Sequence, residues 1–206
     1  MSHASKFDIK FKDKRTLFKA MKSLNLRPEN HVWDEYPSML AKFLEIGATS
    51  MGKLLTGWND DFNVFFIEEA GGFAMHVESH HLSDAEREVK GQILSTKLKY
   101  EYVRHALENI QNTIIASGQS TRLSQEIAED TSTLTLEIGA SGRKLIVTID
   151  KNGIVHENVM GVTGRSCLDL SFLLENIAAQ KVERTWTPEY DEVIEDQVIQ
   201  VLRLSG

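Results

Sequence analysis

The first part of the chain shows a strand-like pattern followed by a helix-like one. Phe7, Ile9 and Phe11 alternate with polar residues, and this period of two is typical of a half-buried strand. Asp13 then precedes apolar residues at helical spacing in the position of an N-cap. We therefore expect a strand over about 5–12 and a helix over about 14–25.

The next stretch combines helical and strand patterns. Apolar residues over 36–58 recur at a spacing that favours two short helices. Residues 63–77 contain two apolar runs around the glycines at 71–72, which predicts a hairpin. Ser83 and Glu86 fit a capping box, after which we expect a helix of roughly 30 residues and about 45 Å. The apolar positions of this helix are Val89, Ile93, Leu98, Val103, Leu107, Ile110 and Ile114.

The second half of the chain predicts a small ββαβ module. After a polar loop over 117–130 and a strand over 133–138, glycines at 139–142 interrupt the pattern, and we place a domain boundary there. Residues 144–159 predict a hairpin that turns at Gly153. A helix is then expected from about 166 and a closing strand over 182–187.

These elements predict an α+β protein with three parts. The parts are an N-terminal domain over 1–140, the ββαβ module over 144–190 and an acidic amphipathic tail over 191–206. The tail interleaves carboxylates with apolar residues at helical spacing, which favours docking onto a protein partner. The candidate partner-binding residues of the tail are Asp191, Glu192, Ile194, Val198 and Val201.

Composition and charge exclude several classes of protein. The 206 residues carry 23 Lys+Arg against 30 Asp+Glu, a net charge of −7, with 41% hydrophobic residues and one cysteine. The apolar fraction can fill a core, and a single cysteine excludes a disulfide scaffold. An acidic chain repels phosphate backbones, so we expect no broad nucleic-acid interface. With no apolar run of ~18–20 residues and no secretion signal, we expect a soluble protein of the cytoplasm or a similarly reducing compartment.

One loop has features of an anion-binding site. Gly161, Gly164, Arg165, Ser166 and Cys167 lie between a predicted strand and a predicted helix start. Glycines let the backbone approach a ligand, while helix N–H groups and an arginine favour an anion such as a nucleotide phosphate. A thiol in the first helical turn acquires a lowered pKa, which favours redox chemistry. The opposing interpretation is a buried small cysteine next to glycines that serve the turn.

A second candidate site is a cluster of histidines. Strand alternation places His76, Glu78 and His80 on one face, and His81 follows, so the cluster could offer imidazoles and a carboxylate to a metal such as zinc. The opposing interpretation is that histidines at a strand end are solvated or serve as caps. His105, His156 and several acids are available for a catalytic triad, yet no enzyme motif is complete and no cofactor is identified.

The residues of the second module resemble a known family. The segments Ile149-Asp150-Lys151-Asn152-Gly153, Gly161-Val162-Thr163-Gly164-Arg165-Ser166-Cys167-Leu168-Asp169-Leu170 and Thr187-Pro188-Glu189-Tyr190 are similar to the domain of unknown function (DUF) 2997 family. Met1-Ser2-His3 and Leu98-Lys99-Tyr100-Glu101-Tyr102-Val103 resemble the DUF 1257 family, which includes an uncharacterised reading frame of cyanobacteria and plastids. Both resemblances imply an accessory role beside MoxR-type AAA+ ATPases.

Three functions follow as hypotheses. The first is a non-enzymatic adaptor that binds a protein partner, such as an AAA+ ATPase, through its acidic tail and sheet edges. The second is a protein that binds a small anion or uses a reactive thiol in the 161–167 loop. The third is a structural component of a larger assembly such as a phage particle.

Overall fold

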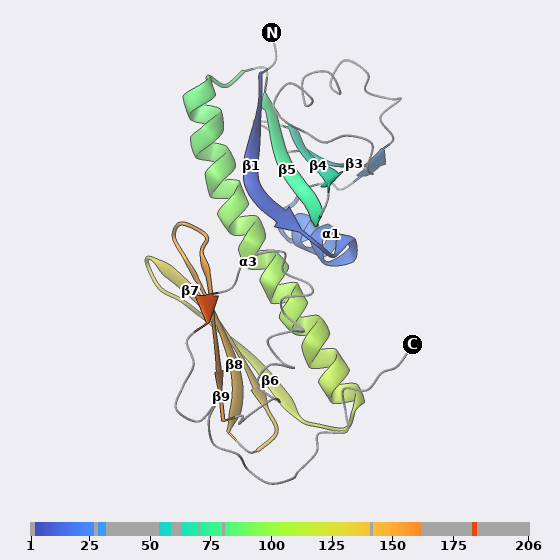
Figure 1. Ribbon diagram of the computed structural model, residues 1–206, viewed down its shortest axis with the longest axis vertical. Helices are drawn as coiled ribbons and strands as arrows, with labels where there is room; N and C mark the ends of the chain where they lie inside the picture. The colour runs from blue at the N-terminus through green and yellow to red at the C-terminus, as the bar shows by residue number, and fades with distance from the viewer. Residues whose placement is uncertain are drawn as a thin grey trace. The chain divides into compact units, whose positions relative to one another are not determined.

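The computed structural model divides the chain into two compact units. The first unit comprises Met1–Val103 with Ala178–Gln180, and the second comprises Arg104–Ile177 with Lys181–Gly206. Helices and mainly antiparallel strands build both units, so the predicted α+β class is confirmed (Figure 1). The residues that the structure describes are 3–26, 29–31, 54–58, 63–69, 71–79, 81–140, 142–161 and 183–184.

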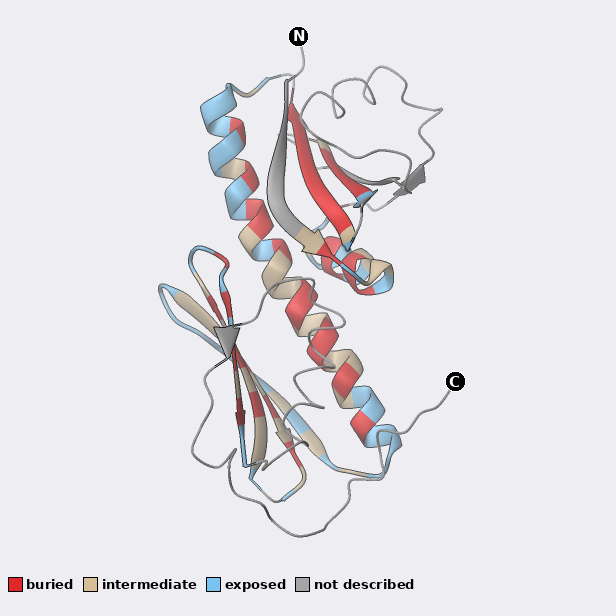
Figure 2. Cartoon of the chain, in the orientation of Figure 1, coloured by how far each residue is buried: buried red, intermediate tan, exposed pale blue. Residues whose placement is uncertain are grey.

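The first unit contains a five-stranded antiparallel sheet with the strand order β1-β5-β4-β3-β2. Within β5, every residue after Gly72 is buried, so both faces of this strand are covered (Figure 2). The elements up to this strand are β1 (His3–Phe11), α1 (Lys14–Ser23), β2 (Glu29–His31), β3 (Leu54–Trp58), β4 (Asn63–Glu69) and β5 (Gly72–Ser79).

The hairpin predicted over 63–77 is confirmed as β4 and β5. Gly71 and Gly72 form its turn with φ angles of 89° and 136°, which a residue with a Cβ rarely adopts. A Cβ on Gly72 would lie 2.6 Å from the carbonyl oxygen of Phe11 on β1. The second glycine therefore allows both the turn and the close approach of β1.

The helix predicted over 14–25 is confirmed as α1. Its N-cap is Asp13, whose carboxylate accepts a hydrogen bond of 2.6 Å from the backbone N–H of Thr16. Leu17, Ala20 and Met21 recur at helical spacing and are buried. The polar cap and the apolar stripe together fix where α1 starts and which face it buries.

A long helix, α3 (Asp84–Ala116), continues from the first unit into the second. It has 33 residues, so the predicted long helix is confirmed. Its Tyr102 ring lies 4.9 Å from the ring of Phe11, which in turn meets Phe66 of β4 edge-on at 5.9 Å. These aromatic contacts attach the helix to the sheet face that carries Phe11 and Phe66.

The second unit contains another five-stranded sheet, with the order β10-β9-β8-β7-β6. Its strands are antiparallel except for β10, which is parallel to β9. Apolar residues alternate along β7 and β8 and are buried on one face (Figure 2). The strands are β6 (Thr121–Ile127), β7 (Thr131–Ile138), β8 (Arg143–Asp150), β9 (Val155–Met160) and β10 (Glu183–Arg184).

The hairpin predicted over 144–159 is confirmed as β8 and β9. The Asp150 carboxylate accepts hydrogen bonds from the N–H groups of Asn152 and Ile154, at 2.9 and 2.8 Å. Gly153 has a φ of 76°, as the predicted turn requires. The described part of the expected closing strand is β10.

Two predictions of secondary structure are wrong. Residues 54–58, expected in a helix, form strand β3, because pairing with β4 and β2 satisfies their backbone groups. The stretch 117–130, expected as a polar loop, contains strand β6, which pairs with β7 over its full length. Strand β6 lies at an edge of the sheet, where little apolar surface is needed, so its residues are mostly polar. This polarity is also typical of a loop, which explains the wrong prediction.

The predicted domain boundary at 139–142 falls within one sheet. The turn at these residues joins β7 and β8, which are hydrogen-bonded neighbours in register from Thr131 opposite Asp150 to Ile138 opposite Arg143. The two compact units divide between Val103 and Arg104, inside α3, and the division into parts over 1–140, 144–190 and 191–206 stays a prediction. The ββαβ stretch therefore shares its sheet with β6 and β7.

Candidate functional site

The end of β5 carries three buried polar residues. His76, Glu78 and Ser79 are exposed by only 0%, 1% and 3%. As predicted, His76 and Glu78 lie on the same face of the strand, and this face is opposite to the one with Met75 and Val77. Burying such groups requires polar partners, so this strand end is a polar element within an otherwise apolar sheet.

Hydrogen bonds organise the end of this strand. The side-chain amide of Asn63, which is opposite Glu78 in the sheet, donates to the Glu78 carboxylate at 3.2 Å. The Ser79 hydroxyl accepts hydrogen bonds from the backbone N–H groups of His81 and Leu82, both at 3.2 Å. The serine thus holds the backbone of His81 and Leu82 ahead of α3, and the His81 side chain is exposed.

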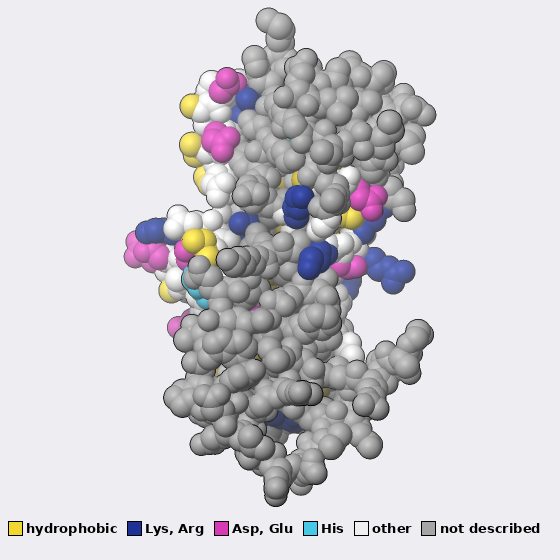
Figure 3. All heavy atoms as spheres, viewed as in Figure 1, with side chains coloured by type: hydrophobic (Ala, Val, Ile, Leu, Met, Phe, Trp, Pro, Cys, Tyr) yellow, Lys and Arg dark blue, Asp and Glu magenta, His cyan; other side chains and the backbone are white. Residues whose placement is uncertain are grey.

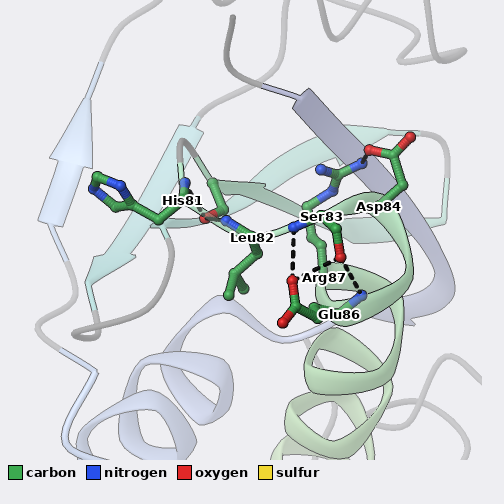
Figure 4. Close-up of polar contacts among 7 residues, drawn as sticks. His81, Leu82, Ser83, Asp84, Glu86 and Arg87 are labelled. Atoms are coloured by element: carbon green, nitrogen blue, oxygen red, sulfur yellow. Dashed lines mark hydrogen bonds and ion pairs between the residues drawn. The ribbon is translucent and has the colours of Figure 1, made fainter.

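The capping box predicted at the start of α3 is confirmed (Figure 4). The Glu86 carboxylate accepts hydrogen bonds from the Ser83 N–H at 2.9 Å and the Ser83 hydroxyl at 2.6 Å. The Ser83 hydroxyl oxygen in turn accepts from the Glu86 N–H at 3.4 Å. The hydrogen bonds from Ser83 lower the pKa of Glu86 below its usual range, which keeps the carboxylate charged at the helix start.

A buried arginine lies in the same first turn. Arg87 is 4% exposed, and its Nη2 donates to the carboxylate of Asp84 at 2.9 Å (Figure 4). Asp84 is itself largely exposed, so the ion pair joins the surface of the helix to the interior of the first unit. The local role of these residues is to fix the junction between β5 and α3.

The structure describes only some of the residues of the predicted metal site. His76 is buried and His81 is exposed, while His80 lies outside the described residues. Among the described residues, no group of three or more His, Cys, Asp and Glu side chains is placed to hold a metal ion. Coordination by a set that includes His80 therefore stays a prediction.

A histidine and a carboxylate also meet on α3. His105 Nδ1 lies 2.7 Å from a Glu108 carboxylate oxygen, and Arg104 is hydrogen-bonded to both side chains. A carboxylate that orients an imidazole is one part of a nucleophilic triad. Cys167, the thiol that the sequence predicts to be reactive, lies outside the described residues.

The described part of the anion-loop prediction is Gly161, at the end of β9. Gly161 has a φ of 68°, and a Cβ there would lie 2.6 Å from the carbonyl oxygen of Gly142. This backbone approach accounts for the glycine without a ligand. The other predicted loop residues, Gly164, Arg165, Ser166 and Cys167, lie outside the described residues. The same holds for the predicted partner-binding residues Asp191, Glu192, Ile194, Val198 and Val201.

The structure exposes an apolar surface on the first turns of α3. Val89 and Ile93 are 60% and 51% exposed, although the helix buries its apolar residues from Leu94 to Ile114. With the exposed Ala85 they form a stripe at i, i+4 and i+8, which we call the α3 stripe. Figure 3 shows hydrophobic side chains next to Asp and Glu along this part of α3. In the sequence, the signal for this stripe is the four-residue spacing of Val89 and Ile93, with Glu86 and Glu88 before them.

One family model matches part of the chain. The profile of a protein family of unknown function, DUF2997, matches residues 145–191, which supports the resemblance of the second module. The resemblance of the N-terminal region to DUF 1257 is not supported by a match. No curated protein and no solved structure matches the chain. No helix among the described residues is long and apolar enough to cross a membrane.

Proposed function

We propose that this protein is a non-enzymatic accessory protein that binds a protein partner through the α3 stripe. The observation that carries the proposal is the exposure of Val89 and Ile93 on one face of α3, a helix that buries most of its other large apolar residues. Eight residues of helix span about 12 Å, so the stripe offers a continuous apolar ridge. Exposed apolar surface rimmed by charge is typical of protein interaction sites.

The charges next to the stripe indicate the chemistry of the partner. Asp84, Glu86 and Glu88 are exposed on the first two turns of α3, and the lowered pKa of Glu86 keeps that side chain ionised. A complementary surface has an apolar centre flanked by Lys or Arg. The AAA+ ATPase systems implied by the family resemblance are the first class of partner to test.

The alternative of an anion or thiol site has less support. The one described glycine of that loop, Gly161, is explained by its approach to Gly142. The His105 and Glu108 pair lies on α3, where both side chains are hydrogen-bonded to Arg104. We therefore favour binding to a protein partner over chemistry at this loop.

The proposal is tested with a matched pair of surface variants. The tagged protein is incubated with native lysate, with and without ATP, retained proteins are identified by mass spectrometry, and the partner is purified for titration. Val89→Gln with Ile93→Gln is expected to weaken binding about tenfold or more, because the apolar centre of the interface is lost. Ile115→Gln is the control, because Ile115 is also 51% exposed on α3 but lies outside the stripe.

The outcome separates the proposal from its alternatives. Binding that falls in the double variant and persists in the control supports the α3 stripe. Wild-type affinity in the double variant would contradict this site. Higher salt is also expected to weaken the complex, because the flanking carboxylates are exposed and their attraction to a basic partner is screened.

A further inference from the structure

Among the strands that the structure describes, β6 lies at an edge of the second sheet. It is the last strand in the order of the second sheet, and among the described strands it pairs only with β7. Arg122, Ser124, Gln125 and Glu126 are exposed, and Ile127 is 68% exposed. An uncovered edge presents backbone N–H and C=O groups that can pair with another strand.

The hydrogen bonds to β7 show which groups point outwards. The N–H of Ala128 donates to the carbonyl of Thr131 at 2.8 Å, and the N–H of Gly139 donates to the carbonyl of Ser120 at 2.7 Å. In an antiparallel pair such bonded positions recur every second residue, so the even-numbered residues of β6 face β7. The residues whose backbone groups face the free edge are therefore Thr121, Leu123, Gln125 and Ile127.

We propose that β6 binds the β6 strand of a second copy of this chain, antiparallel and with a two-fold axis through Ser124. In this register Leu123 is opposite Gln125 of the partner subunit, and Thr121 is opposite Ile127 of the partner subunit. Every outward N–H and C=O group of these four residues then gains a backbone partner. The two sheets join into one, and the two-fold symmetry closes the assembly as a dimer.

Charge complementarity selects this register. Arg122 lies opposite Glu126 of the partner subunit, and the symmetry repeats this pair. Both are non-hydrogen-bonded positions, where Cα atoms are about 4.5 Å apart and side chains interact most closely. Within its own sheet Glu126 is opposite Thr133, whereas Arg122 is opposite Glu137, which is bonded to Lys144 at 2.7 Å. The second copy thus gives Glu126 a cationic neighbour that its own cross-strand position lacks.

Neighbouring registers lack this complementarity. An axis through Arg122 places two arginines opposite each other, and an axis through Glu126 does the same with two glutamates. An axis through Leu123 or Gln125 places one of the two charged residues opposite Ser124 of the partner subunit and the other beyond the end of the partner strand. Like charges directly opposite each other are destabilising, so the axis through Ser124 is the favoured register.

Charge reversal tests the register in the full chain. Sedimentation over a concentration series is expected to show a dimer for the wild type. Arg122→Glu and Glu126→Arg are each expected to raise the dissociation constant about tenfold or more, because two pairs become repulsive. The double variant with both changes restores opposite charges and is expected to restore the dimer. A monomer at all concentrations, or a dimer that tolerates both single changes, would overturn the proposal.

Cross-linking gives a second measurement. In a Cys167→Ser background, Ser124→Cys places two thiols on the proposed axis, where Cα atoms about 4.5 Å apart lie within disulfide range. Oxidation is expected to give a covalent dimer faster than in Asn152→Cys, an exposed position in the turn after β8. Equal rates for the two variants would count against pairing at Ser124. If an added protein partner abolishes the cross-link by occupying β6, the second copy is not the physiological occupant.

Discussion

At the scale of single residues, Tyr102 connects the long helix to the first strand and helix. Its hydroxyl accepts a hydrogen bond of 2.8 Å from the backbone N–H of Asp13, and its ring packs against Phe11. Burial raises the pKa of the Tyr102 hydroxyl, and the hydrogen bond from Asp13 only partly opposes this effect. One side chain thus positions the N-cap of α1 and contributes to the core.

The raised pKa of Tyr102 predicts a loss of stability in alkali. Above the ordinary value of 10.0, the unfolded chain loses the proton while the folded protein keeps it, so stability falls as pH rises. The free energy of unfolding is expected to fall by up to about 1.4 kcal/mol per pH unit from this group. Tyr102→Phe removes this slope and costs about 1–2 kcal/mol at neutral pH, because the Asp13 N–H loses its acceptor.

Urea unfolding between pH 7 and pH 11 measures both effects. The neutral-pH comparison reports the hydrogen bond, and the difference in slope above pH 10 reports the ionisation. An equally steep alkaline loss in Tyr102→Phe would show that other groups cause it.

At the scale of elements, a glycine pair decides the geometry of the β4–β5 hairpin. Both glycines have positive φ, yet only Gly72 lies against another strand. A Cβ on Gly71 would meet no atom within 4 Å, whereas one on Gly72 would lie 2.6 Å from the Phe11 carbonyl oxygen. A substitution at Gly71 therefore introduces backbone strain alone, whereas a substitution at Gly72 introduces backbone strain and a steric clash.

Alanine at each glycine gives a matched comparison. Gly71→Ala is expected to cost about 1–2 kcal/mol, the strain of a left-handed alanine. Gly72→Ala is expected to cost at least about 1–2 kcal/mol more, because β1 must also move away from β5. Chemical denaturation of both variants measures the difference. Equal losses would mean that the contact with Phe11 is readily relieved.

Local signals in the sequence located several of these elements. Asp13 and Ser83 marked helix starts because a cap needs only neighbouring backbone groups. The runs on either side of 71–72 and 150–153 marked hairpins because turn chemistry is equally local. Strands β3 and β6 were missed because a short apolar run fits a helix or a strand, and an edge strand has little apolar signal.

At the scale of the whole molecule, the second sheet extends beyond the segment that matches a family. The match begins at Leu145, inside β8, while β6 and β7 precede it. Leu145 and Val147 are buried opposite Leu136 and Leu134 of β7. Removing β7 exposes these side chains and the backbone edge of β8.

Two fragments test whether β8 and β9 need β6 and β7 in order to fold. A fragment over 104–206 keeps the end of α3 and all strands of the sheet, and it is expected to retain strand structure. A fragment over 144–206 loses β6 and β7, and it is expected to unfold or aggregate because β8 lacks its partner. Far-ultraviolet circular dichroism and amide chemical-shift dispersion measure the outcome. A folded shorter fragment would support the boundary predicted at 140–144.

The sequence by itself determined the caps, the turns, the long helix and the alternation of the inner strands. Each of these features depends on residues a few positions apart, so local chemistry is sufficient. The tertiary structure decided that Leu54–Trp58 is a strand, that β6 is an edge and that Val89 and Ile93 are exposed. Those outcomes depend on which distant segments pair or cover a surface, and helical spacing alone does not say whether a neighbour is present.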